Sequence, residues 1–248
     1  MKLVSTLAFL CGLTLFASFA GRAADSSLAA SARFDSMSSV ILSAQGGNQL
    51  VYADFETVKD NRPYSSRGGW VQLTSYSERP QFPARVKGQE GVNPPAPELV
   101  RLRKDDPNRA ISFDYELPAG NEWANAAVEV HGLPDKDGKP AAEDLTAYQF
   151  LSMQVYATGL TSMRAEFVSR GNGIEANAYP QLTFKISPGF NTYRLALKSL
   201  TQPSWAEPRV GPKDVLKKLT MVILSAYCNQ CQIPMKGTVV VDNMVFQN

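Results

Sequence analysis

The side chains best suited to chemistry in this sequence are a single histidine and the acids near it. His131 is the only histidine, and it ends the strand-like stretch Trp123–His131 two residues after Glu129. Alternate residues of a strand share one face, so Glu129 would orient His131. Glu166 is a polar-face acid of another strand-like stretch, and glycoside hydrolysis uses two carboxylates about 5–10 Å apart. A glycan hydrolase or lyase that uses Glu129, Glu166 and His131 is therefore one candidate function.

Other features of the sequence favour a protein that is not an enzyme. It has no nucleophile elbow, phosphate-binding loop, dinucleotide-binding fingerprint or zinc-protease motif. A lone histidine at a strand end is more often a surface or hydrogen-bonding residue than a catalytic one. We therefore expect no catalytic residues, and the hydrolase or lyase stays an alternative.

The same polar faces suit a binding surface. Sugar rings stack on aromatic side chains, and their hydroxyl groups need hydrogen-bond partners that replace water. The alternating positions of three predicted strands supply both kinds of side chain. The candidate ligand-binding residues are Trp123, Asn125, Glu129, His131, Gln154, Tyr156, Arg164, Glu166 and Arg170. The alternative is a solvent-facing sheet with incidental aromatic residues.

Residues 1–23 have the pattern of a signal peptide. Lys2 precedes an apolar run, Leu3 to Phe19, and small residues then allow cleavage after Ala20 or Ala23. No other stretch has the roughly 18 apolar residues of a membrane span. The pattern predicts a periplasmic or secreted protein.

The net charge excludes two classes of partner. The chain of 248 residues has 25 basic and 23 acidic side chains, and removal of Lys2 and Arg22 leaves equal numbers. Proteins that bind nucleic acid or anionic membranes use an excess of Lys and Arg. We therefore expect a neutral polar ligand such as carbohydrate, with an envelope protein partner as the alternative.

The cysteines favour a disulfide. Cleavage of the signal peptide would remove Cys11, leaving Cys228 and Cys231. Two cysteines this close in an exported protein are expected to be bonded. A redox-active pair needs a helix start after a strand, and a zinc site needs more ligands than one histidine can add.

The hydrophobic pattern predicts an all-β fold. Residues 24–48 are a Ser/Ala-rich lead-in or linker, and residues 49–248 contain many short stretches rich in Val, Ile, Phe and Tyr between turn residues. Apolar and polar residues alternate in Arg109–Leu117 and Trp123–His131, as in a two-sheet antiparallel β-sandwich with a shared core. Only Pro212–Leu219 and Glu143–Tyr148 resemble short helices. The Pro-rich segment 78–98 is excluded from a central strand.

Four motifs, in order along the chain, resemble galactose-binding-domain-like β-jelly rolls, especially carbohydrate-binding modules. They are VYADFET (Val51–Thr57), followed by Trp70, then EDLTAYQFLSMQVYATG (Glu143–Gly159), FNTYRLALKSLTQPSWAE (Phe190–Glu207) and GTVVVDNMVF (Gly237–Phe246). The complex I intermediate-associated proteins share this pattern. The resemblance implies a single jelly-roll domain with Trp205 in the core.

The same resemblance implies a structural calcium ion near the first and last strands. The matching positions are Asp54, Glu56 and Asp242. Calcium takes six to eight oxygen ligands, so backbone carbonyl groups would complete the site. The alternative is that these acids accept hydrogen bonds from the backbone at strand ends.

Together these features predict an exported, non-catalytic protein that binds carbohydrate through a polar and aromatic sheet face. The first alternative is a structural or assembly protein of the bacterial envelope that binds a protein partner. The second is the glycan hydrolase or lyase.

Overall fold

The computed structural model describes residues 48–174 and 178–248. The predicted signal peptide, Cys11 and all of the predicted lead-in except Asn48 lie outside this part of the chain. Export and the proposed domain limits therefore stay predictions.

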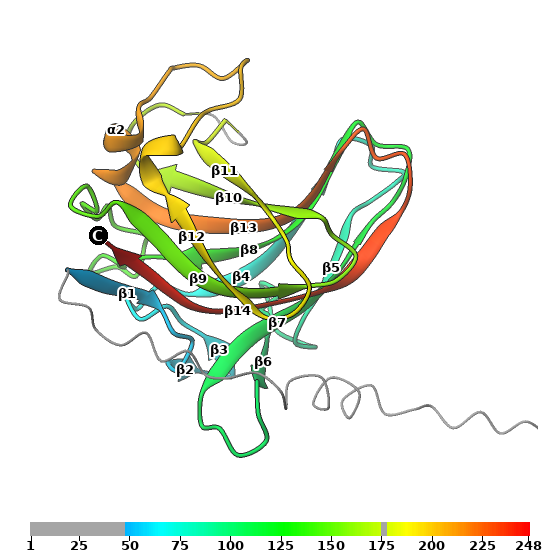
Figure 1. Ribbon diagram of the computed structural model, residues 1–248, viewed down its shortest axis with the longest axis horizontal. Coiled ribbons are helices and arrows are strands. Elements are labelled where there is room, and N and C mark those ends of the chain that lie inside the picture. Colours follow the sequence, from blue (N-terminus) through cyan, green and yellow to red (C-terminus); the bar gives the residue numbers. More distant parts are fainter. Residues whose placement is uncertain (1–47, 175–177) are drawn as a thin grey trace, which may run out of the picture.

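The described chain folds into two antiparallel β-sheets packed face to face (Figure 1). Five strands of the larger sheet follow the order β12 (Asn191–Ala196), β9 (Phe150–Ala157), β14 (Met235–Gln247), β7 (Arg109–Leu117) and β5 (Arg85–Lys87). Its other two strands are β1 (Gln49–Ala53), which pairs with β14, and β6 (Glu98–Arg101), which pairs with β7.

The smaller sheet has five strands in the order β11 (Gln181–Lys185), β10 (Ser162–Ser169), β13 (Leu219–Asn229), β8 (Trp123–His131) and β4 (Val71–Ser77). The remaining elements are the short hairpin β2 (Val58–Lys59) and β3 (Arg62–Pro63), the 3₁₀ turn η1 (Leu197–Ser199) and the helix α2 (Pro212–Leu216). The predicted β-sandwich with one or two short helices is confirmed.

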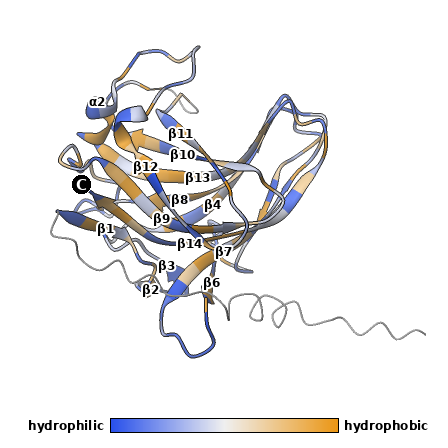
Figure 2. Ribbon diagram, in the orientation of Figure 1, coloured by the Kyte–Doolittle hydropathy of each residue, from blue (hydrophilic) through white to orange (hydrophobic). Residues whose placement is uncertain are grey.

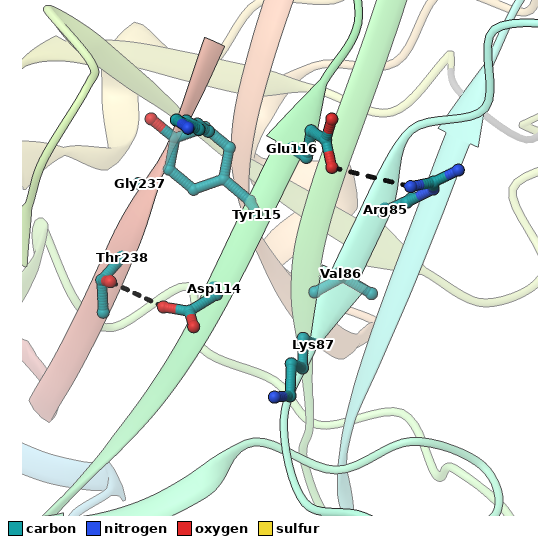
Figure 3. Close-up of a pocket in the computed structure, with 9 residues that line it drawn as sticks. Arg85, Val86, Lys87, Asp114, Tyr115, Glu116, Gly237 and Thr238 are labelled. Atoms are coloured by element: carbon teal, nitrogen blue, oxygen red, sulfur yellow. Dashed lines mark hydrogen bonds and ion pairs between the residues drawn. The ribbon is translucent and has the colours of Figure 1, made fainter. Parts of the chain in front are cut away.

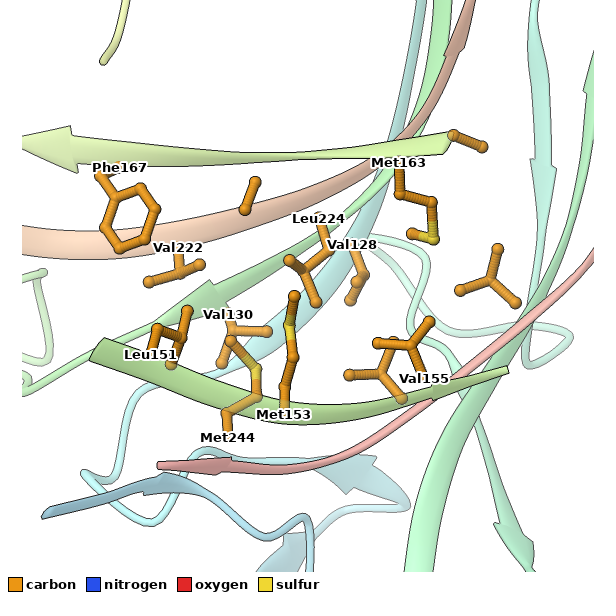
Figure 4. Packing of buried hydrophobic residues seen from close by; sticks show 14 of the residues in the cluster. Val128, Val130, Leu151, Met153, Val155, Met163, Phe167, Val222, Leu224 and Met244 are labelled. Carbon is orange, nitrogen blue, oxygen red and sulfur yellow. The ribbon is translucent and has the colours of Figure 1, made fainter. Parts of the chain in front are cut away.

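The core lies between the two sheets, where the apolar sides of the alternating strands meet. Val128 and Leu224 from the five-stranded sheet face Met153 and Val155 from the seven-stranded sheet (Figure 4). The hydropathy colouring shows apolar residues concentrated in the strands and polar residues in the connections (Figure 2). Each buried large side chain contributes about 1.5–3 kcal/mol to folding. We therefore assign the stability of the sandwich mainly to this layer.

The structure differs from the sequence-based expectation in two short segments. Residues Glu143–Tyr148 form no helix, because the Glu143 and Leu145 amides donate to the carbonyl groups of Leu219 and Leu216 instead of to their own segment. The Pro-rich segment 78–98 contains a short strand, β5, which lies at the edge of its sheet. This position is consistent with the exclusion of the segment from a central strand.

At one end of the molecule the β7–β8 and β13–β14 connections lie together, at the upper right of Figure 1. The Gly120 amide donates to the Cys231 carbonyl, and the Gln230 amide donates to the Glu122 carbonyl. Cys228 and Cys231 form a disulfide across the turn, as the sequence predicts, and both are buried. These contacts fix the position of Trp123, the first residue of β8.

Candidate functional site

Six of the nine predicted ligand-binding residues lie on one surface, the outer face of the five-stranded sheet, which faces away from the core. They are Trp123, Asn125, Glu129, His131, Arg164 and Glu166. Strands β8 and β10 both pair with β13, so their polar sides share this face. The structure therefore brings together most of the predicted surface, including all three residues of the hydrolase or lyase alternative.

The other three predicted residues lie elsewhere. Gln154 and Tyr156 are on β9, which pairs with β14 and β12 in the seven-stranded sheet, so their outer face is on the opposite side of the sandwich. Arg170 follows the end of β10, and its guanidinium donates to the Pro140 carbonyl at 2.8 Å. The expectation that all nine residues line one groove is wrong, because alternation within a strand does not specify which sheet the strand joins.

A hollow of about 390 Å³ crosses the outer face of the five-stranded sheet between two exposed tryptophans. We call it the Trp123–Trp205 groove. It is lined by Trp123, Ala124, Asn125, Arg164, Gln181, Pro203, Trp205, Tyr227, Cys228 and Asn229. Trp123 is 39% exposed and Trp205 is 63% exposed, so both indole rings are accessible to a ligand.

Trp205 corrects an expectation drawn from the family resemblance, which placed it in the core. It lies in the segment between η1 and α2, which rises above the five-stranded sheet at the top of Figure 1. The segment is held by its polar contacts: the Gln202 side chain bonds to the Ala178 carbonyl and the Val210 amide at 2.9 and 2.8 Å. The indole is left outside, at the rim of the groove.

Arg164 lies in the lining of the groove and is held on two sides. Its Nη2 atom is 2.9 Å from Oε1 of Glu166, and its guanidinium lies 4.9 Å from the centre of the Tyr227 ring. An ion pair and a cation–π contact of this kind restrict a long side chain to one position. The guanidinium is therefore oriented in the groove before any ligand binds.

The outer face carries an unusual concentration of buried polar atoms without partners. In the described part of the chain, such side-chain atoms occur on Thr74, Asn125, His131, Arg164 and Gln181, all of which lie on the outer face of the five-stranded sheet. Thr74 and His131 lack a hydrogen bond of standard geometry but lie beside the Glu129 carboxylate. The other three residues line the groove. A buried polar atom without a hydrogen bond costs about 1–3 kcal/mol. Because Asn125, Arg164 and Gln181 line the groove, small rotations of their side chains would bring these atoms to its surface, where a ligand could supply the missing partners and recover this free energy.

A row of polar side chains crosses the same face beside the groove. Glu129 lies opposite Gln72 on one side and Ile223 on the other, and Ile223 in turn lies opposite Glu166. The Gln72 amide donates to Glu129 Oε2 at 2.5 Å, and His131 Nε2 is 3.7 Å from the same oxygen. The His131 ring stacks on Trp70, with 4.3 Å between ring centres.

The two carboxyl groups of this row have pKa values shifted in opposite directions. Burial raises the pKa of the Glu166 carboxyl, and the charge of Glu129 adds to this effect, while Arg164 opposes it. Burial also acts to raise the pKa of Glu129, but the contacts with His131 and Gln72 outweigh it, so this pKa lies below its usual range. Glu129 is thus the more readily ionised of the two groups.

Several residues of this face were missed by sequence reasoning. Tyr227 and Gln181 line the groove and occupy outward positions of β13 and β11, so the alternation of residues in these strands could have identified them. Tyr76 is exposed on β4. Burial, together with the charges of Glu166 and Glu129, raises the pKa of Tyr179, which places this residue near the acidic row. No periodic pattern in the sequence identifies Tyr179, because it precedes β11 in a connection.

A second hollow, of about 600 Å³, lies at the other sheet and offers less to a ligand (Figure 3). Three of its charged groups already have partners: Arg85 lies 3.8 Å from Glu116, and the Thr238 hydroxyl donates to Asp114 at 2.6 Å. Among the described residues, its lining contains no tryptophan on which a sugar ring could stack. The Tyr115 hydroxyl donates to the Thr158 carbonyl. We therefore assign the candidate site to the Trp123–Trp205 groove.

The predicted calcium ligands accept hydrogen bonds from the protein. Asp54 accepts from the Glu56 amide, Glu56 from the Arg109 amide, and Asp242 from Asn108 and the Asn243 amide. Within the described residues, no three His, Cys, Asp or Glu side chains are grouped so that they could hold a metal ion. This arrangement fits the alternative stated above, and calcium binding stays a prediction.

Asp242 is fully buried at the centre of this region. Burial raises the pKa of its carboxyl group to about 7, the charges of Glu56 and Asp54 add to this effect, and the bonds from Asn108 and Asn243 oppose it. The three acids are thus close enough for their charges to interact.

Comparison with solved structures relates this geometry to known proteins. The family 11 carbohydrate-binding module of the cellulosomal cellulase Lic26A-Cel5E of Clostridium thermocellum aligns with a TM-score of 0.50 and 16% identity, over 82% of this chain and 95% of the module. A solution structure of the same family, CtCBM11, aligns with a TM-score of 0.51 and 14% identity, over 83% of this chain and 98% of the other. The fold is similar to that of carbohydrate-binding modules. The predicted resemblance is confirmed at the level of the fold.

Sequence comparisons give no further assignment, since no protein-family model and no curated protein matches this chain. At 14–16% identity the solved structures support the fold, and ligand and mechanism must be argued from the site itself. None of the helices in the described residues is long and apolar enough to cross a membrane.

Proposed function

We propose that this protein is exported and that it binds carbohydrate, without transforming it, in the Trp123–Trp205 groove. One observation carries the proposal: exposed Trp123 and Trp205 border a groove lined by polar side chains, three of which have a buried atom without a hydrogen-bond partner. A sugar ring offers an apolar face for stacking and hydroxyl groups that both donate and accept hydrogen bonds. This ligand chemistry therefore matches both features.

The related structures support the same class of ligand. One structure of the family 11 module from Clostridium thermocellum was determined in complex with a β-1,3-1,4-mixed-linked tetrasaccharide, and it aligns with a TM-score of 0.50 and 16% identity over 82% of this chain and 96% of the module. The balance of charge that would follow export also suits a neutral ligand. Neither point identifies the sugar that this protein binds.

A polysaccharide array followed by calorimetry on each hit would test the proposal. Replacement of Trp123→Ala or Trp205→Ala should weaken binding about tenfold or more, because large aromatic contacts dominate binding free energy. Tyr156→Ala removes an aromatic ring from the opposite sheet and serves as the matched control, which should retain binding.

Absence of any hit on the array would contradict the proposal and favour the alternative, an envelope protein partner. Equal losses of affinity in Tyr156→Ala and the tryptophan variants would also contradict it. Thermal melting of each variant distinguishes loss of binding from loss of folding.

A second candidate function rests on the opposed pKa shifts of Glu129 and Glu166, since such pairs supply the acid and base of glycosidases. Three contacts argue against it. Glu166 is tied to Arg164 and Ser225, Glu129 is tied to Gln72, and neither carboxylate lines the groove. We expect no new reducing ends when the protein is incubated with the glycans it binds. Product formation that is lost in Glu166→Gln would instead establish catalysis.

A further inference from the structure

We infer that the Trp123–Trp205 groove selects carbohydrates without acidic groups, and that Glu166 and Glu129 impose this selection. The inference rests on the proposed carbohydrate-binding function and specifies the chemical class of the ligand. Neutral and amino sugars would bind, whereas uronic acids and sulfated or phosphorylated sugars would be disfavoured.

Arg164 would by itself suggest the opposite selection. A guanidinium in a binding groove pairs readily with the carboxylate or sulfate group of an acidic sugar. In this protein the charge already has a partner, since Glu166 lies 2.9 Å from the guanidinium and is itself 4% exposed. An acidic ligand would have to compete with Glu166 for the same cation.

Glu129 adds a second negative charge to the same row of the sheet. It is 9% exposed and lies across Ile223 from Glu166, so water screens it weakly. His131 lies 3.7 Å from this carboxylate and offsets its charge only when the imidazole is protonated. Among the described residues that line the groove, Arg164 is the only lysine or arginine, and it is paired with Glu166. Lys185 is exposed at the edge strand and does not line the groove, and the segment that carries Trp205 contributes one charge of each sign, Glu207 and Arg209.

The unpartnered atoms also favour a ligand that donates hydrogen bonds. Asn125 Oδ1 and Gln181 Oε1 are acceptors in the groove, while Arg164 Nε is the donor there that lacks a partner. Hydroxyl and ammonium groups can donate to these oxygens, whereas a carboxylate or sulfate group can only accept. With the amide groups of Asn125 and Gln181 oriented as in the structure, an acidic substituent next to their oxygens would leave these oxygens unpaired. Charge and hydrogen bonding therefore favour the same class of sugar.

Three matched pairs of polysaccharides test this inference. Barley β-glucan, konjac glucomannan and starch are each compared with their C6-oxidised forms, in which a carboxylate replaces the hydroxymethyl group on the same backbone. The wild-type protein should bind the oxidised form about tenfold more weakly at low salt, since unfavourable charge pairs at an interface reduce affinity. Added salt should narrow the difference.

The variant Glu166→Gln keeps the shape of the side chain and frees the charge of Arg164. It should recover most of the affinity for the oxidised form, and Glu129→Gln should recover part of it. Glu116→Gln removes the same charge from the outer face of the seven-stranded sheet and is the matched control, which should leave the ratio unchanged. If Glu166→Gln does not fold, Glu129→Gln and the wild-type ratio still decide the question.

The possible outcomes separate the inference from the function on which it rests. Equal or tighter binding of the oxidised forms by the wild-type protein would overturn the inference and leave carbohydrate binding intact. The inference would also be overturned, with carbohydrate binding intact, if both glutamine variants bound the two forms with the same affinity ratio as the wild-type protein. Failure of every neutral and oxidised polysaccharide on this panel and on the array would overturn both.

Discussion

At the scale of single residues, the chemistry of the candidate site depends on which partners each buried carboxyl group has. Glu129 has a hydrogen-bond donor in Gln72 and a histidine beside it, whereas Glu166 is more deeply buried and is balanced by Arg164. The same residue type therefore has a lowered pKa in one place and a raised pKa in the other. Neighbours, rather than residue type, determine the charge presented to a ligand.

Asp242 gives a prediction about stability and pH. The pKa of its carboxyl group is raised from the ordinary value of 3.8 to about 7 in the folded protein. Because the folded state holds the proton more tightly, stability should fall as the pH rises from about 4 to about 7. Each unit of pKa corresponds to about 1.4 kcal/mol, so the decrease should amount to a few kcal/mol.

Chemical denaturation of the wild-type protein and Asp242→Asn, in the presence of a chelator, measures this effect. The asparagine variant should lose most of the pH dependence. If the two proteins respond to pH in the same way, the assignment to Asp242 is wrong.

Added calcium then tests the predicted ion. It should raise the melting temperature of the wild-type protein near pH 8 and leave that of Asp242→Asn unchanged. No shift in either protein would contradict the calcium prediction.

The sequence predicts which residues share a face of one strand, but it does not predict which sheet that strand joins. Asn125 and Tyr156 both occupy polar positions of their strands, yet they lie on opposite sides of the sandwich. A period of two residues tells which side chains share a face of one strand. It carries no information about the neighbouring strand, which is set by pairing between distant segments.

At the scale of elements, the long strands could be predicted and the two-residue strands could not. The limits of β7 and β8 agree with the sequence pattern, because each has nine residues and a clear alternation. Strands β2 and β3 have two residues each and carry no periodic signal. They exist because their backbone groups pair with each other.

The β13–β14 connection supports the exposed Trp123 and depends on the disulfide. Asn229 lies opposite Trp123, and Cys228 lies opposite Ala124 in the same register. Replacement of both cysteines by serine should lower stability by about 2 kcal/mol, as expected from the entropy of closing so short a loop. Binding should weaken too, since the indole would be less well fixed.

Thermal melting and calorimetry of the double-serine variant measure these two losses, and thiol labelling of the native protein tests the bond itself. Native Cys228 and Cys231 should resist labelling until the protein is reduced and unfolded. Full labelling of both thiols in the native secreted protein would contradict the disulfide.

At the scale of the whole molecule, the groove joins residues that are far apart in the chain. Trp123 begins a strand of the five-stranded sheet, whereas Trp205 belongs to the segment between η1 and α2. Neither the distance between the indoles nor their exposure follows from the sequence, because the position of that segment depends on Gln202 and its contacts. The family resemblance placed Trp205 in the core because the matching position in that family is usually buried.

Export is a property of the whole chain, and it leads to a simple prediction. Expression with the native amino terminus in a Gram-negative host should deliver the protein to the periplasm or medium, with a new amino terminus after Ala20 or Ala23. Amino-terminal sequencing of the recovered protein checks the site. Recovery of uncleaved protein from the cytoplasm would contradict the predicted signal peptide.

The central claim is that one face of the sandwich binds carbohydrate, and mapping of the bound surface by NMR tests it most directly. A ¹⁵N-labelled protein titrated with a neutral oligosaccharide identified on the array should show its largest shifts at the indole groups of Trp123 and Trp205 and at the side chains of Asn125, Arg164 and Gln181. Gln154 and Tyr156 on the opposite sheet should not shift. Shifts centred on the seven-stranded sheet would contradict the account.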